Sequence, residues 1–158
     1  MILGALAGGL VGTVVLTTGL RLAQEVGWTR MDIPLLLGTM LTGDRGRAEA
    51  LGYAFHFLNG LGFSLAYGLV FTAVGQAGWL FGLALGVVHA AFAGGALVNL
   101  ILPAIHPRMG SPWTDASESP VLEPPGFMLV NYGSATVLVT LAMHMAYGAI
   151  VGAFAAGL

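Results

Sequence analysis

Residues 50–107 read ALGYAFHFLNGLGFSLAYGLVFTAVGQAGWLFGLALGVVHAAFAGGALVNLILPAIHP, and this stretch, without a single Asp, Glu, Lys or Arg, decides the fold. An apolar run needs about 20 residues to cross the hydrocarbon core of a bilayer. The stretch is long enough for two crossings, which are separated by the tight turn Gly-Gln-Ala-Gly at 75–78. We therefore predict two membrane-spanning helices that form an antiparallel hairpin.

The charged residues lie outside that stretch, in the segments 21–49 and 108–123. Charged residues make up 8% of the chain, against roughly 25% in soluble domains. This distribution indicates a multi-pass membrane protein whose surface is solvated mostly by lipid. It excludes an electrostatic nucleic-acid binder, because the chain has no basic patch to neutralise phosphates. The absence of cysteine excludes disulfides and thiolate metal sites.

Four segments are long and apolar enough to span a membrane, and they are predicted at residues 2–22, 48–74, 79–102 and 130–157. Pro103 is expected to end the third of these helices. The whole chain, residues 1–158, is then a single transmembrane domain, an all-α integral membrane four-helix bundle.

Two further segments are predicted to lie at the edge of the membrane. Residues 32–43 begin with the capping residue Asp32, followed closely by Pro34, and predict a helix of about nine residues. Because this helix is too short to cross, it is expected to be interfacial or re-entrant. The proline-rich loop 103–125 is expected to pack under the bundle on the cytoplasmic side.

The five Arg residues predict the orientation. Four of them lie at the end of the first span or in the loop after it, and Arg108 follows the third, so all five fall on one side of a four-span bundle. Cytoplasmic loops collect Arg and Lys. We therefore expect both loops to be cytoplasmic, and both termini and the turn at 75–78 to lie on the periplasmic side of a bacterial inner membrane.

Small residues recur at every fourth position in each predicted span, which is typical of faces where membrane helices pack closely. In the second and fourth spans these runs are interrupted by His56 and His144. Each of these histidines should therefore face a neighbouring helix. Counting residues from the 75–78 turn places His89 at the depth of His144, with Tyr147 one turn away. The same count places His56 nearer the cytoplasm, with Asn59, Asn99 and His106.

Ionisable side chains inside a membrane are costly and usually functional. His89 and His144, with Tyr147 beside them, are candidate axial ligands of a haem, and with His56 they are candidate ligands of copper or iron. A single histidine is also a candidate ligand of a chlorophyll-type pigment. The alternative is that these imidazoles are neutral and hydrogen-bonded across packed helix faces.

A polar network near the cytoplasmic side is the other candidate site, and it consists of Asn59, Asn99, His106, Asp32 and Glu123. In one interpretation the two carboxylates supply a site with His106 or His56. In the other, Asp32 caps a helix and Glu123 pairs with an Arg.

Six short sequence strings are similar to strings in known membrane proteins. They are MDIPLLLGTM at 31–40, FHFLNG at 55–60, HPRM at 106–109, LEPPGF at 122–127, NYG at 131–133 and HMAYGAI at 144–150. Together they resemble a family of small uncharacterised four-span bacterial integral membrane proteins. The resemblance covers most of the chain. It implies a membrane location and adds no catalytic residue.

No nucleotide-binding, hydrolase or metalloprotease motif is found in the sequence, and no nucleophile–base pair is visible, which disfavours an enzyme. We therefore expect an accessory subunit of a larger membrane complex that binds a metal, haem or pigment through its intramembrane histidines. Its expected partners are the lipid bilayer and further membrane subunits, either copies of itself or other chains. The alternative is a small proton or solute carrier in which the histidines are relay groups.

Overall fold

The computed structural model describes residues 1–109 and 122–157, and these residues are almost entirely helical. Four helices are long and apolar enough to cross a membrane: α1 (Ile2–Glu25), α3 (Arg45–Val74), the continuous helix Trp79–Ile105 and α6 (Ala135–Ala156). No strand occurs in the described ranges, where a single isolated bridge joins Met109 and Leu122. The prediction of an all-α chain with four membrane-length apolar helices is confirmed.

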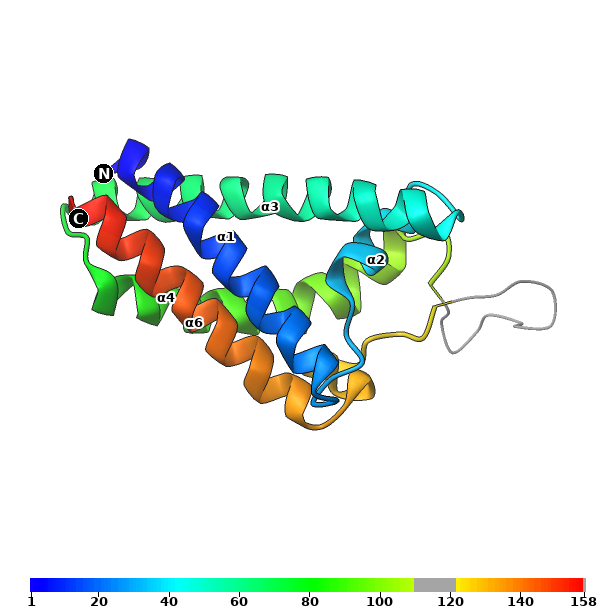
Figure 1. Cartoon of the computed structure of the whole chain (residues 1–158). Helices are drawn as coiled ribbons and strands as arrows, with labels where there is room; N and C mark the ends of the chain where they lie inside the picture. Colours follow the sequence, from blue (N-terminus) through cyan, green and yellow to red (C-terminus); the bar gives the residue numbers. More distant parts are fainter. Residues whose placement is uncertain (110–121, 158) are drawn as a thin grey trace.

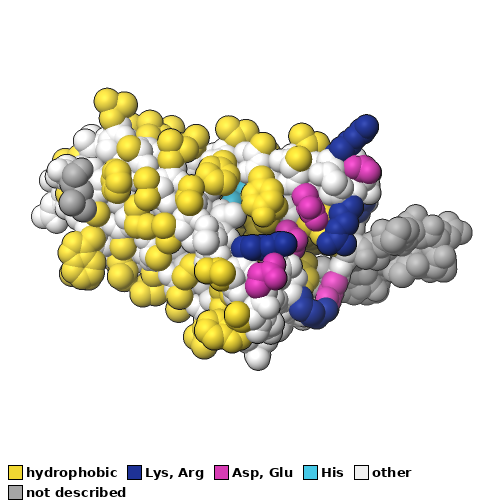
Figure 2. Space-filling view, in the orientation of Figure 1, with side chains coloured by type: hydrophobic (Ala, Val, Ile, Leu, Met, Phe, Trp, Pro, Cys, Tyr) yellow, Lys and Arg dark blue, Asp and Glu magenta, His cyan; other side chains and the backbone are white. Residues whose placement is uncertain are grey.

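The four long helices surround a common interior (Figure 1). Helices α1 and α6 run side by side and obliquely across one face, while α3 follows one edge and the Trp79–Ile105 helix lies behind. The chain termini and the turn between α3 and α4 lie at one end, and α2 lies at the other. Charged side chains gather at the α2 end, and hydrophobic side chains are spread among uncharged groups over the rest of the visible face (Figure 2).

Glycines allow the closest helix contacts, as the small-residue pattern predicts. Helix α4 (Trp79–Ala91) and α6 approach so closely that a Cβ atom on Gly82 would overlap the carbonyl group of Gly148, and one on Gly148 would overlap that of Gly82. Because the apolar membrane interior gives helices no hydrophobic reason to associate, such backbone contact is a main source of cohesion.

The short helix α2 (Ile33–Gly38) begins as predicted. Oδ1 of Asp32 accepts a hydrogen bond of 2.9 Å from the backbone N–H of Leu35, which caps the helix. The helix is shorter than predicted, because the hydroxyl of Thr39 bonds back to the carbonyl of Leu35 and the chain continues in turns. Helix α2 packs against α3, where Gly52 lies against the backbone of Pro34.

The third long helix differs from the prediction in its middle and at its end. Residues Phe92–Ile101 form a π-helix, η1, in which the side-chain amide of Asn99 donates to the carbonyls of Gly94 (2.7 Å) and Gly95 (2.8 Å). The helix then continues through α5 (Leu102–Ile105) rather than ending at Pro103. Pro103 lies in the first turn of α5, directly after the π-helix.

The last long helix begins five residues later than residue 130. The segment before it, η2 (Phe127–Tyr132), consists of short 3₁₀ turns interrupted by a kink at Met128 and Leu129, whose φ angles of 52° and 61° are left-handed. It is bounded by Gly126 and Gly133, both at positive φ. Most of the loop expected to pack under the bundle, residues 110–121, lies outside the described residues. At its described ends, the N–H of Leu122 donates to the carbonyl of Arg108 at 2.7 Å.

Candidate functional site

A cavity of about 530 Å³ lies among α1, α2, α3, η1 and α6. Its walls are mostly apolar, and no charged side chain is among the described residues that line it. All three intramembrane histidines reach it from different helices: His56 from α3, His89 from α4 and His144 from α6. Asn59 and Tyr147 also line the cavity.

His89 and His144 are in direct contact, as their equal predicted depth requires. Their ring centroids are 4.7 Å apart and the rings are nearly perpendicular, at 83°. The contact depends on Gly86, where a Cβ atom would overlap the backbone of His144. The absent side chain on α4 therefore brings the two backbones close enough for the imidazoles to meet.

The hydrogen bonds of His144 determine its tautomer. Its Nδ1 lies 2.8 Å from the carbonyl oxygen of Thr140, which can only accept, so Nδ1 carries the hydrogen. In the neutral ring, Nε2 then keeps a free lone pair. His89 is held differently: its Nδ1 lies 3.4 Å from the hydroxyl of Tyr67, and its ring packs on Phe63 with centroids 3.8 Å apart.

Two buried polar atoms at the cavity have no partner among the described residues. These are Nε2 of His56 and Oγ1 of Thr140. Most buried polar groups in proteins are hydrogen-bonded, and each exception calls for an explanation. Thr140 is only 1% exposed, so its hydroxyl is not satisfied by bulk solvent. The cavity therefore has hydrogen-bonding capacity that the protein itself does not use.

The position of His56 corrects one expectation. It was predicted in a separate cluster nearer the cytoplasm with Asn99 and His106, yet it shares the cavity with His89 and His144. The prediction counted depth along each helix as though the helices were parallel. Helix α6, which carries His144, instead crosses α3 obliquely, so equal residue counts along these helices do not correspond to equal depth (Figure 1).

Tyr147 is fully engaged in packing. Its hydroxyl donates a 2.5 Å hydrogen bond to the carbonyl of Gly60, which joins α6 to α3, and the residue is 1% exposed. Its ring lies 5.7 Å from that of His89. Tyr147 therefore forms the wall behind the histidine pair, with its proton already committed to a backbone acceptor.

The five residues of the predicted polar network are dispersed over separate contacts. Asn59 lines the cavity, while the Asn99 side chain donates to carbonyl groups within η1. Asp32 caps α2 and also lies 3.6 Å from Nη1 of Arg21, and Glu123 pairs with Arg30 at 3.3 Å. The capping and Arg-pairing interpretation of the two carboxylates is the one that these contacts bear out.

His106 joins α5 to α2 rather than entering the cavity. Its Nδ1 accepts from the N–H of Arg108 at 3.1 Å, so its Nε2 carries the hydrogen and donates to the carbonyl of Leu36 at 3.0 Å. Because Leu36 lines the cavity, His106 fixes one of its walls.

Two geometric observations argue against the predicted metal and haem sites as the side chains now stand. No group of three or more His, Asp or Glu side chains arranged for a metal is found among residues 1–109 and 122–157. A metal–imidazole bond is about 2 Å long, so two imidazoles on opposite sides of one haem iron place their ring centres roughly 6 Å apart. The centres of His89 and His144 are closer, at 4.7 Å, so this pair does not fit a haem without moving apart.

Three features of the site were absent from the sequence interpretation: the free hydroxyl of Thr140, the contact of Tyr67 with His89, and η1. Thr140 precedes His144 by one helical turn, and this spacing was a usable signal. The resemblance to a family of small four-span proteins stays a prediction. Comparisons with protein-family models, with curated proteins and with solved structures found no match to this chain.

Proposed function

We propose that this chain is a small multi-pass protein of a bacterial cytoplasmic membrane that binds a small-molecule cofactor in the histidine-lined cavity. The observation that supports the proposal is the convergence of His56, His89 and His144, from three helices, on one cavity. Polar groups inside a membrane are costly. Three imidazoles around a mostly apolar cavity have a physical reason to be there if a ligand engages them.

The candidate cofactors differ in what they demand of the imidazoles. A chlorophyll-type pigment or a similar metal complex needs one axial nitrogen, and the free Nε2 of His144 is suited to that role. A bare copper or iron ion needs several ligands, and no group of three or more His, Asp or Glu side chains is arranged for one among residues 1–109 and 122–157. A haem between His89 and His144 needs the two rings to move apart from their centroid distance of 4.7 Å.

The proposed role is that of an accessory subunit in a larger membrane complex, made of copies of this chain or of other proteins. It is supported by the small size of the chain and by the absence of a catalytic motif. Mild detergent extraction followed by size measurement tests it: co-purification with a partner or as an oligomer is expected. A monomer that lacks any partner contradicts the subunit role and leaves ligand binding standing.

Ligand binding is tested on the purified full chain by absorption spectroscopy, metal analysis and mass spectrometry of an organic extract. We expect a stoichiometric ligand that His144→Ala loses. The matched control is Arg45→Gln, because Arg45 is exposed at the far end of α3 from the turn. Protein that is folded and free of metal, pigment and extractable ligand overturns the proposal.

The second candidate function is proton transfer, and a separate depression favours it. His56 also borders a small pocket at the charged end of the bundle, together with Arg21 and Asp32. Figure 2 shows a hollow beside the charged side chains on this face. Protons would pass from this end to His56 and then to the His89–His144 pair. Proteoliposomes with His56→Gln or His89→Gln should lose proton flux; unchanged flux contradicts this function.

A further inference from the structure

We propose that the ligand of the cavity is a neutral, lipid-soluble ring compound with carbonyl or hydroxyl groups, of the quinone or quinol class, and that it enters from the bilayer between α3 and η1. This inference rests on the proposed function, namely that the cavity binds a ligand, and adds the chemical class and the route.

The lining of the cavity selects a neutral ligand. No Asp, Glu, Lys or Arg is among the described residues that surround it, and its surface is overwhelmingly apolar. An ionic ligand there would lose its hydration without gaining a counter-charge, which is strongly unfavourable in an apolar environment. A compound that already partitions into lipid loses little hydration on entry.

The cavity atoms that are free to form hydrogen bonds favour a ligand with carbonyl or hydroxyl groups. The hydroxyl of Thr140 has no partner among the described residues, so it can donate to a carbonyl or accept from a hydroxyl. The free Nε2 of His144 accepts, which suits the hydroxyl of a quinol. His56 contributes another unpartnered nitrogen. A hydrocarbon chain would leave all of these atoms unsatisfied, and this disfavours a lipid tail as the occupant.

The size and walls of the cavity suit a ring. About 530 Å³ lies within the range of pockets for drug-sized molecules, roughly 300–1,000 Å³. Phe55, Phe63 and Phe92 line it together with the imidazole of His89. Aromatic rings pair favourably in offset or edge-to-face arrangements. The ring of a quinone would thus find both aromatic side chains and hydrogen-bonding atoms in the lining.

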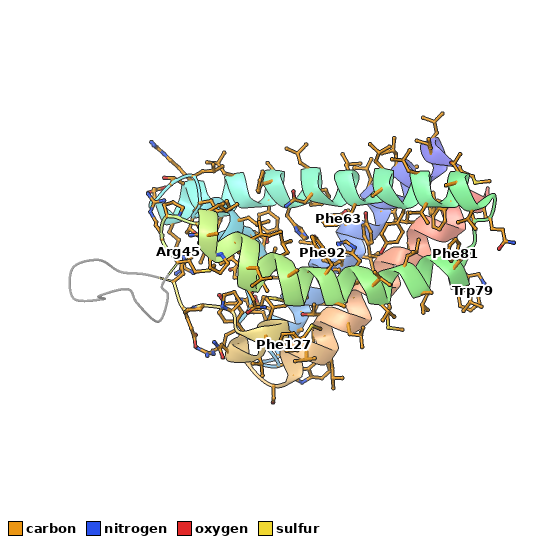
Figure 3. The ribbon with its side chains drawn as sticks, turned by 180° about the vertical axis from the view of Figure 1, so that it is seen from behind. Arg45, Phe63, Trp79, Phe81, Phe92 and Phe127 are labelled. Atoms are coloured by element: carbon orange, nitrogen blue, oxygen red, sulfur yellow. The ribbon has the colours of Figure 1, made fainter. Side chains whose placement is uncertain are left out.

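The route is indicated by the way α3 faces the third long helix. Within the described residues α3 packs closely on α1 and α2, whereas it meets α4 and η1 mainly through side chains such as Phe63 and Phe92, with ring centroids 6.2 Å apart. Figure 3 shows these two phenylalanines between α3 and the helix that faces it. Phe55 and Phe92 line the cavity yet remain 36% and 41% exposed, so this wall is incompletely closed.

The experiment uses the full chain in nanodiscs of phosphatidylethanolamine and phosphatidylglycerol, with a photoreactive azido-naphthoquinone as the probe. Saturable labelling of cavity-lining segments of α3 or η1 is expected, with competition by an unlabelled short-chain ubiquinone. Thr140→Val should weaken binding at least fivefold. Its matched control is Thr72→Val, because the Thr72 hydroxyl bonds to its own helix at Gly68 and lies outside the cavity.

A second variant tests whether binding needs the open volume of the cavity, and it leaves the polar atoms unchanged. Ala93 lines the cavity on η1, so Ala93→Phe should fill the proposed route and lower labelling while every imidazole and hydroxyl remains. Size-exclusion profiles and thermal unfolding verify that both variants fold. If Thr140→Val and Ala93→Phe bind like Thr72→Val, or if excess phospholipid displaces the probe equally well, the inference is overturned.

The outcome also separates this inference from the proposed function. A protein that carries a metal or pigment on His144 and does not bind the quinone refutes the ligand class and leaves cofactor binding intact. A protein that binds neither refutes both.

Discussion

His106 is a single residue that connects two elements through both of its ring nitrogens. It accepts from the N–H of Arg108, donates to the carbonyl of Leu36, and is 5% exposed. His106→Leu leaves both backbone partners unpaired, at a cost of about 1–3 kcal/mol each when they stay buried. We expect a corresponding loss of unfolding free energy in detergent.

The control for His106→Leu is Arg45→Gln, which removes an exposed ion pair between Arg45 and Glu49 with a distance of 3.3 Å. Such a pair contributes about 0–1 kcal/mol. Equal effects of the two substitutions would show that His106 does not fix α2.

Tyr132 gives the fold a dependence on alkaline pH. Burial raises the pKa of Tyr132 to about 12; the Glu123 carboxylate also raises it, and Arg30 lowers it. Its hydroxyl donates to the backbone carbonyl of Glu123 at 2.9 Å. Because the folded pKa lies above the unfolded value of about 10, this contribution to stability is complete below pH 10 and is lost as the pH rises toward 12.

Unfolding midpoints between pH 9 and pH 12 should therefore fall more steeply for the native chain than for Tyr132→Phe, which has no proton to lose at this position. Parallel curves for the two proteins would contradict a role of Tyr132 in this dependence.

At the scale of elements, the glycine contacts between α4 and α6 give opposite predictions for two similar substitutions. A Cβ atom on Gly82 would overlap the backbone of Gly148, and overpacking of this kind costs about 1–3 kcal/mol. Gly62 on α3 has no atom within 4 Å of such a Cβ atom. There alanine should stabilise the helix by up to about 1 kcal/mol. Thermal unfolding should therefore separate Gly82→Ala from Gly62→Ala in sign.

Element types were easier to predict than their geometry. The apolar runs predicted the long helices, and the capping residue Asp32 predicted the start of α2. Both features depend only on residues that are close together in the sequence. The π-helix depends on Asn99 reaching the carbonyls of Gly94 and Gly95, and no periodicity reveals that. The proximity of His89 and His144 followed from helix depth, whereas the position of His56 required crossing angles that are set by packing.

At the scale of the whole molecule, the charged end of the bundle lies next to the histidine-lined cavity. The ion pairs lie around one end, where Arg21 meets Glu25 and Asp32 and where Arg30 meets Glu123. The histidine cavity lies inward of this end and is bounded there by α2, through Leu36. The polar atoms of the cavity thus lie between a charged end and an apolar wall that faces the expected position of lipid.

The arginines at this end predict the orientation of the chain, and the lack of native cysteine makes the test direct. Gln76→Cys lies in the turn between α3 and α4, and Arg47→Cys lies near the start of α3, at opposite ends of one helix. Because arginines collect on the cytoplasmic side, a membrane-impermeant maleimide added to intact cells with a permeabilised outer membrane should label Cys introduced at position 76 and spare position 47. Full permeabilisation should expose both. Labelling of position 47 alone in intact cells would reverse the orientation, and labelling of both would show that α3 does not cross the membrane.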